Sequence, residues 1–263
     1  MPFRIWPAAV TALLGAAALI DITLSPAAMA NQRSETEIEE IVRNYLLENP
    51  EVIFEAVERY QTKQQDLARA AAREAAREYL PELRNDPAGH VIDAPSGEAE
   101  ILVIEFFDYN CGFCRQATDF VFSLQEDNED LEIILQELPV TNANSREPAL
   151  LALAAADTDS YVGLHRAMMT SDSLVDGDRA ADIARDLDIS DDLINRALTP
   201  GERQDALHAR LDRSMDIADA LGIDGTPAFL IASADGKYIE VIPGLSEAGV
   251  IAAIEEARTG QRR

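Results

Sequence analysis

The chain has 263 residues, of which 47% are hydrophobic and 27% charged, and this balance excludes a wholly disordered or membrane-embedded protein. Its 48 acidic residues outnumber its 22 basic residues, which gives a formal net charge of −26. A surface this acidic repels phosphate backbones and anionic lipid headgroups, so nucleic acid is not expected as a partner.

Residues 1–30 have the pattern of a secretory signal peptide. Arg4 supplies the positive start, an apolar run extends from Trp6 to Ile20, and a small-x-small cleavage sequence ends at Ala30. The alternative is an uncleaved membrane anchor, but the run is shorter than the ~20 residues needed to cross a bilayer. We therefore predict cleavage after Ala30 and a mature protein in the periplasm, which is an oxidising compartment.

Residues 31–84 are predicted to form a helical arm ahead of the main domain. Ser34 and Glu37 have the spacing of a capping box, which starts a short helix that ends before Pro50. Pro50 suits the first position of a second helix, and neither Gly nor Pro occurs again until Pro81. One long helix is therefore expected between these two prolines.

The second arm helix carries an apolar stripe that needs a partner surface. Its members are Ile53, Val57, Tyr60, Leu67, Ala71 and Ala75. The arm either folds back along its own domain or meets a second copy of the chain. The later half of the stripe is mostly alanine, so the sequence does not by itself predict a tightly packed coiled coil. We favour contact between copies, and so predict a homo-oligomer, either a dimer or a trimer.

After a turn-rich linker at 85–89, residues 89–263 are predicted to form an α/β domain. The runs 100–107 and 131–138 are apolar and rich in β-branched residues, which is typical of buried strands. The stretch 115–125 between them has helical spacing. This order predicts a strand, helix, strand unit whose two strands are parallel.

The second half of the domain is predicted to begin with a helical insertion. Residues from about 145 to 221 have helical spacing, with breaks near 157–159, 171–173 and 199–201. Two short strands, 228–232 and 238–242, then flank an Asp-Gly turn typical of a hairpin. A final helix is expected after them, with a serine at its N-cap.

The chemistry is expected at Cys111 and Cys114, the only two cysteines of the chain, at the start of a predicted helix. A helix N-terminus stabilises a thiolate at the first position, so this spacing favours a redox-active disulfide. An inert crosslink is one alternative, but so short a loop stabilises the fold little. A metal site is another, although a closed site needs four ligands and the three histidines are distant in sequence. We expect no metal or other cofactor.

Two separate motifs agree with each other: EFFDYNCGFC, which ends at Cys114, and the Gly-Thr-Pro sequence at 225–227. Together they resemble the DsbA-like branch of the thioredoxin superfamily, over about residues 89–259. The resemblance implies a thioredoxin-like fold with a helical insertion, and a cis bond between Thr226 and Pro227. Pro227 would then belong to the catalytic site, and the Thr226 backbone would pair with bound substrate. Otherwise Pro227 is an ordinary turn residue.

The same resemblance implies roles for the residues around the cysteines. Cys111 would form the mixed disulfide with substrate, Cys114 would resolve it, and Gly112 and Phe113 would contact the substrate. Glu105 would carry a proton to or from Cys114, because strand alternation takes its side chain away from water, where an ionised carboxylate is costly. The alternative for Glu105 is a partly exposed side chain near the strand end.

Other polar residues near the motif are expected to be bystanders. Asp108 and Tyr109 would shape the rim of the site rather than act. Met168 and Met169 could suggest copper binding, but on an amphipathic helix they more often fill a core. His165 on the same segment is expected to be structural.

The chain departs from the strongly oxidising members of this family at two places. Gly-Phe, not Pro-His, separates the cysteines, so no imidazole further lowers the pKa of Cys111, and Thr226 replaces valine before the proline. With the arm, these features are similar to oligomeric disulfide isomerases and to ScsC and Com-one-like periplasmic proteins. We predict a periplasmic thiol-disulfide oxidoreductase, with isomerase or reductase action slightly ahead of net oxidation.

Its expected partners are secreted or periplasmic proteins that carry thiols or disulfides, together with a membrane redox partner. Three alternatives stay open. The protein could be a monomeric DsbA-like disulfide oxidase, or a copper-handling protein whose thiolates bind Cu(I). It could also be a holdase-like binding module in which the redox pair is regulatory.

Overall fold

The computed structural model describes residues 34–260, so the predicted signal peptide lies outside the described residues. Helix α1 (Glu35–Glu48) begins at the predicted capping box. The Ser34 hydroxyl accepts a hydrogen bond from the Glu37 amide, and the Glu37 carboxylate accepts one from the Ser34 amide. Both groups are otherwise unsatisfied at a helix start, so the sequence pattern and the helix boundary coincide.

Helix α2 (Glu51–Asn85) runs through Pro81, although the sequence analysis expects it to end there. Proline inside a helix removes a hydrogen bond and costs about 3 kcal/mol. Burial offsets this cost, because Ala76, Leu80 and Leu83 pack in one core with the sheet. The last turns of α2, which the sequence analysis places in the arm, therefore contribute to the core of the domain.

The chain divides into two compact units within α2, between Arg59 and Tyr60. In the first unit, no residue of α1 is buried. Eight large apolar side chains of this unit are 48–75% exposed, and we call them the arm surface: Ile38, Ile41, Val42, Tyr45, Leu47, Ile53, Phe54 and Val57. Eight exposed large apolar side chains within two helical stretches make this unit a candidate contact surface.

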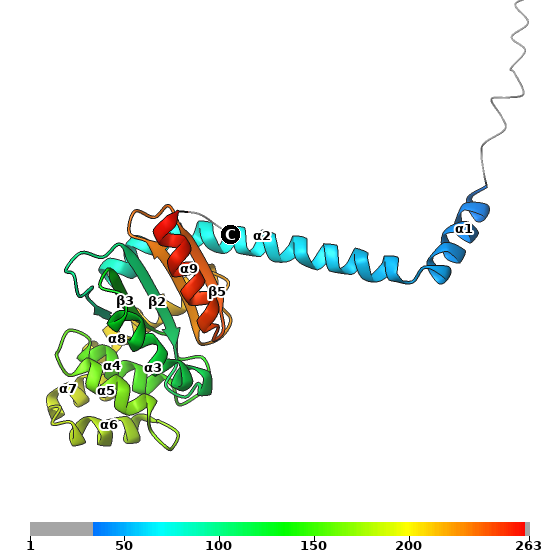
Figure 1. Ribbon diagram of the computed structural model, residues 1–263. Helices are drawn as coiled ribbons and strands as arrows, with labels where there is room; N and C mark the ends of the chain where they lie inside the picture. The colour runs from blue at the N-terminus through cyan, green and yellow to red at the C-terminus, as the bar shows by residue number, and fades with distance from the viewer. Residues whose placement is uncertain (1–33, 261–263) are drawn as a thin grey trace, which may run out of the picture. The chain divides into compact units, whose positions relative to one another are not determined.

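The second unit is built on a five-stranded sheet in the order β1-β3-β2-β4-β5 (Figure 1). Its strands are β1 (Gly89–Ile92), β2 (Ile101–Phe107), β3 (Leu131–Glu137), β4 (Ala228–Ser233) and β5 (Ile239–Pro243). Strands β2 and β3 are parallel, as predicted, and every other pairing is antiparallel. No sequence pattern predicts β1, a four-residue edge strand.

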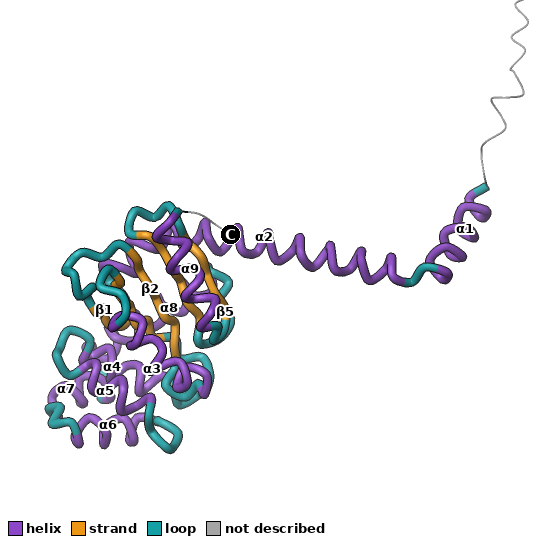
Figure 2. The backbone as a smooth tube through the Cα atoms, in the orientation of Figure 1, coloured by secondary structure: helices purple, strands orange, loops and turns teal. Residues whose placement is uncertain are grey.

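Helices cover both faces of the sheet (Figure 2). On one face, α3 (Gly112–Glu126) and α9 (Glu247–Thr259) share a core with Val103 and Phe107 of β2. On the other face, α8 (Glu202–Ala220) and the end of α2 share a core with the alternate residues of β2. Because side chains alternate along a strand, Glu105 faces the same side as α3. The fold is the predicted thioredoxin-like α/β class.

The segment predicted to be a helical insertion contains α4 (Arg146–Ala155), α5 (Tyr161–Met169), α6 (Gly177–Asp186) and α7 (Asp191–Leu198), and ends in α8. The turn between α6 and α7 was not predicted, and Asp188 adopts a φ of 58° there. None of the helices in residues 34–260 combines the length and apolar character that a bilayer-spanning segment requires.

Candidate active site

Residues 108–111, which we call the redox turn, connect β2 to α3. The Asp108 carboxylate holds this turn, since it accepts hydrogen bonds from the amides of Asn110 and Thr141, each at 2.7 Å. The Cys111 amide donates to the Asp108 carbonyl at 3.0 Å. Cys111 is the N-cap residue of α3, so its side chain lies where the exposed amides of the first helical turn can stabilise a negative charge.

Both cysteines are reduced and buried: Cys111 is 5% exposed and Cys114 is completely inaccessible. The Cys111 sulfur lies 3.1 Å from the carbonyl oxygen of Thr226, to which it donates when the thiol is protonated. The two thiols also interact with each other, one turn apart at the start of α3. The structure thus places together the two cysteines and the Thr226 backbone that the sequence analysis singles out.

The two thiols have opposite electrostatic environments. A hydrogen bond from the Cys114 thiol, aided by Thr226 and by the first amides of α3, lowers the pKa of Cys111 to about 5 despite partial burial. Burial raises the pKa of Cys114 far above its usual value, and the neighbouring Cys111 and Glu105 raise it further. At neutral pH Cys111 is therefore a thiolate, while Cys114 keeps its proton.

Glu105 is 1% exposed on the central strand, which excludes the alternative of a partly exposed glutamate. Burial, and after it the charge of Cys111, raise the pKa of Glu105 to about 8. Within residues 34–260 its Oε1 has no hydrogen-bond partner. This carboxyl group can therefore hold or release a proton near neutral pH. When it is ionised, its negative charge raises the pKa of Cys114.

The segment before β4 lies against the redox turn. The Thr226–Pro227 peptide bond is cis, as the resemblance implies. The Thr226 hydroxyl lies 3.3 Å from that of Thr141, in the loop after β3. Phe113 is 62% exposed and lies two residues after Cys111, so a large apolar group meets solvent close to that cysteine.

The sequence predicts that Asp108 and Tyr109 shape the rim of the site, but in the structure neither residue lies there. Each is 1% exposed, because the carboxylate of Asp108 turns inward to the backbone and the ring of Tyr109 enters the core. His165 is also 1% exposed, and its ring packs edge-on against Phe107. Glu137, a buried acid that accepts a hydrogen bond from the Tyr109 hydroxyl, is not among the residues predicted for the site. The sequence feature that could have identified Glu137 is an acidic residue inside an apolar strand.

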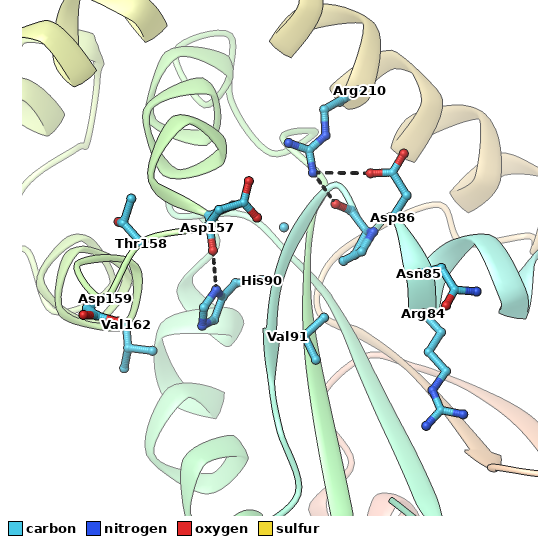
Figure 3. Close-up of a pocket in the computed structure, with 13 residues that line it drawn as sticks. Arg84, Asn85, Asp86, His90, Val91, Asp157, Thr158, Asp159, Val162 and Arg210 are labelled. Carbon is cyan, nitrogen blue, oxygen red and sulfur yellow. Dashed lines mark hydrogen bonds and ion pairs between the residues drawn. The ribbon is translucent and has the colours of Figure 1, made fainter. Parts of the chain in front are cut away.

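A cavity of about 840 Å³ lies beside β1, lined by residues around His90, Asp157 and Arg210 and by no residue of the redox turn (Figure 3). Its polar groups are largely paired: His90 Nδ1 donates to a carbonyl at 2.6 Å, and Arg210 contacts Asp86 at 3.8 Å. In the described part of the chain, no three His, Cys, Asp or Glu side chains are grouped so that they could hold a metal ion.

The lowered pKa predicts the pH profile of Cys111. In the reduced protein, thiolate absorbance and the rate of alkylation at Cys111 should rise with pH, reach half their maximum near pH 5 and stay level to pH 8. Cys114 should stay unmodified until the protein unfolds. The unfolded chain is the control, with a midpoint near 8.5. A native midpoint at or above that value would contradict the assignment of Cys111 as nucleophile.

The fold is a thioredoxin fold that carries a pair of thiols at the start of α3. A family model described as DSBA-like thioredoxin domain matches residues 102–252, which is more than half of the chain. The chain belongs to this DsbA-like family. A second model, described as copper resistance protein ScsC N-terminal domain, matches residues 35–66.

Solved structures agree with this assignment. A thioredoxin-like oxidoreductase from Silicibacter pomeroyi is 29% identical, with a TM-score of 0.58, and the match covers 67% of this chain and 96% of that one. BcfH from Salmonella enterica Typhimurium is 25% identical, with a TM-score of 0.65 and coverages of 85% and 95%. The catalytic domain of Proteus mirabilis ScsC, 22% identical with a TM-score of 0.59 and coverages of 71% and 98%, shares the fold.

Among curated proteins, the chain is similar to Na(+)/H(+) antiporter NhaA 3 of Salinispora tropica, with 29% identity over 166 residues. A second match is Na(+)/H(+) antiporter NhaA 1 of Salinispora arenicola, with 28% identity over 139 residues. The matched regions make up 61% and 51% of this chain. The chain spans only 24% and 20% of the length of these two relatives.

Proposed function

We propose that this protein exchanges disulfides with secreted proteins in the periplasm, acting more as an isomerase or reductase than as an oxidase. The observation that carries the proposal is the paired environment of the thiols, a Cys111 thiolate beside a protonated Cys114. A Cys111 pKa of about 5 lies between the ~3.5 of strongly oxidising relatives and the ~7 of thioredoxin. This intermediate pKa supports a dithiol that is less strongly oxidising than those relatives and can also act as an isomerase or reductase.

In the reductive direction, the Cys111 thiolate attacks a disulfide of the substrate. A mixed disulfide forms, and one substrate sulfur leaves as a thiolate that takes a proton from solvent. Cys114 then loses its proton and attacks the Cys111 sulfur, which releases the second substrate sulfur and leaves a Cys111–Cys114 disulfide. Two electrons pass to the substrate, and a membrane redox partner restores the dithiol. Oxidation of a substrate dithiol is the reverse sequence.

Resolution of the mixed disulfide needs a base for the Cys114 proton, and Glu105 suits this role. Its pKa of about 8 leaves both protonation states populated near neutral pH, and its charge reaches Cys114. Glu105→Gln should therefore slow resolution by at least ~10²-fold, because glutamine cannot take the proton. Rapid-quench analysis should show the mixed disulfide accumulating, with its formation unchanged. Resolution at the wild-type rate would remove Glu105 from the mechanism.

The residues around Cys111 suit an extended polypeptide as substrate. The exposed Phe113 ring offers apolar contact beside the sulfur, and the Thr226 segment offers backbone groups for pairing. The arm surface supports assembly of two or three copies, which would hold several thiols around one misfolded client. Such assembly favours isomerisation, which needs repeated encounters with one substrate.

The direction of electron flow is tested by the redox state of the thiols in the cell. Acid quenching followed by alkylation should find Cys111 and Cys114 reduced in periplasmic extracts. A fully oxidised pair would identify a disulfide donor and would support the monomeric oxidase instead. The control is Cys111→Ser, which cannot form the intramolecular disulfide.

Cu(I) handling is a second candidate, favoured by two adjacent thiols and by the copper resistance description of the matched N-terminal model. Titration of the reduced protein against a Cu(I) chelator of known affinity tests it. Retention of one equivalent of Cu(I), lost in Cys111→Ser, would support this candidate, and no retention would exclude it.

A further inference from the structure

A buried polar cluster lies behind the redox turn, and the exchange reaction does not use it. Glu137, the last residue of β3, is 1% exposed. Its Oε1 accepts hydrogen bonds from the hydroxyls of Tyr109 at 2.9 Å and Tyr161 at 3.2 Å. The Tyr109 oxygen also lies 3.3 Å from His165 Nδ1. The cluster thus joins the sheet, the redox turn and helix α5.

The protons of this cluster can be assigned from its contacts. Tyr109 has one hydroxyl proton and donates it to Glu137, so His165 Nδ1 must carry the proton that bridges it to Tyr109. Burial raises the pKa of Glu137 well above its usual range, against the lowering effect of the two tyrosine hydrogen bonds, and burial lowers the pKa of His165 to about 3. Burial thus favours the neutral form of both groups. The carbonyl oxygen of a neutral acid accepts two hydrogen bonds, as Oε1 does here. Glu137 therefore acts as an acceptor and not as a charge.

Tyr109 connects the cluster to the nucleophile, because it lies in the redox turn directly before Asn110 and Cys111. Its hydroxyl is fixed by Glu137, and its carbonyl accepts from Arg115 Nε at 2.8 Å. Of the hydrogen bonds that lower the Cys111 pKa, those from Phe113 and Cys114 come from the first turn of α3, and the one from Thr226 comes from the segment before β4. A shift of the redox turn relative to that segment would lengthen the hydrogen bond from Thr226.

We propose that Glu137 is a positioning residue, which acts through the Tyr109 hydroxyl to hold the redox turn where the Cys111 thiolate is stabilised. The proposal rests on the proposed function in one respect, that Cys111 is the reactive thiol. Glu105 and Glu137 then differ in kind, although both face the same side of neighbouring strands. Glu105 acts by gaining and losing a proton, whereas Glu137 needs only a carbonyl oxygen.

Substitution by glutamine separates these two requirements. Glu137→Gln keeps an oxygen for both tyrosine hydroxyls, so the Cys111 pKa and the rate of mixed-disulfide resolution should match the wild type. Glu137→Leu leaves both hydroxyls without an acceptor, and should raise the Cys111 pKa by about one unit, the size of one lost hydrogen bond to a charged group. Glu105→Gln, in contrast, should slow resolution.

The two tyrosines supply a matched pair of variants. Tyr109→Phe and Tyr161→Phe each remove one hydroxyl from the same Glu137 oxygen, and both rings are fully buried. Both variants should lower the thermal midpoint, because each removes a buried hydrogen bond to Glu137, and Tyr109→Phe also leaves the Nδ1 proton of His165 without its acceptor. Only Tyr109→Phe should raise the Cys111 pKa, by about one unit, since only Tyr109 belongs to the redox turn.

The measurement is thiolate absorbance of the reduced full-length protein as a function of pH, with Cys111→Ser as the blank. A Cys111 pKa that is unchanged in Tyr109→Phe, or equally raised in Tyr161→Phe, would overturn the proposal. So would a Glu137→Gln variant that behaves like Glu137→Leu. The titration needs no substrate, so these outcomes are separate from failure of the proposed function, which would appear as wild-type protein unable to exchange disulfides.

Discussion

Replacing Cys111 with serine should reduce thiol-disulfide exchange to the uncatalysed rate, whereas replacing Cys114 should stop the reaction at the mixed disulfide. A serine hydroxyl is not ionised at neutral pH and cannot form a disulfide, so Cys111→Ser has no nucleophile. In Cys114→Ser the Cys111 sulfur still attacks the substrate, but the enzyme has no resolving thiol to displace the substrate from the mixed disulfide. Turnover of a disulfide-bonded peptide and mass analysis under non-reducing conditions measure the two outcomes.

The cysteine variants also separate the enzyme from the holdase-like alternative. If Cys111→Ser still protects an unfolding client from aggregation as well as the wild type does, client binding does not depend on the redox pair. Residual exchange in Cys111→Ser would contradict the assigned nucleophile. Thermal unfolding of each variant is the control for folding, because both cysteines are packed in the core at the start of α3.

Deleting residues 34–59 should convert an oligomer into a folded monomer that loses isomerase activity and keeps dithiol oxidation. Residues from Tyr60 onward form a compact unit, and Ala76 and Leu80 then remain to cover the sheet. A longer deletion to residue 80 would uncover that core, so the cut belongs in the first half of α2. Isomerisation needs repeated access to one client, whereas oxidation needs one encounter. Light scattering and refolding of a scrambled disulfide substrate measure the two effects.

A pair of point variants controls for the deletion. Ile53 in α2 is 50% exposed and Ile251 in α9 is 49% exposed, so an aspartate costs a similar amount at either position in the isolated chain. Only Ile53→Asp should dissociate the oligomer, because only Ile53 belongs to the arm surface. If the full-length protein is already monomeric, or if the deletion leaves isomerisation intact, the monomeric DsbA-like oxidase becomes the better proposal.

Several elements follow from the sequence because their causes are local. The capping box at Ser34 marks the start of α1 by side-chain and backbone groups only three residues apart. The parallel pair β2 and β3 follows from two apolar runs separated by one helix. The candidate nucleophile Cys111 also follows from local sequence, because the spacing of the two cysteines and the predicted start of a helix are enough to identify it.

Other features depend on contacts between residues far apart in the chain, and only the tertiary structure decided them. Strand β1 has too few residues for a periodic pattern and exists because it pairs with β3. Helix α2 passes Pro81 because the sheet buries the residues around it. The Tyr109–Glu137 hydrogen bond joins positions separated by 28 residues.

The sequence by itself determined the candidate reactive pair, the order of the main elements and the family resemblance, because each rests on neighbouring residues or on a short motif. Only the tertiary structure decided the protonation states, since the pKa values of Glu105 and Cys114 are set mainly by burial. Burial is a property of the whole packed domain, in which strands, helices and insertion together exclude water. No local pattern specifies it, and for that reason the sequence identifies the thiols but not their charges.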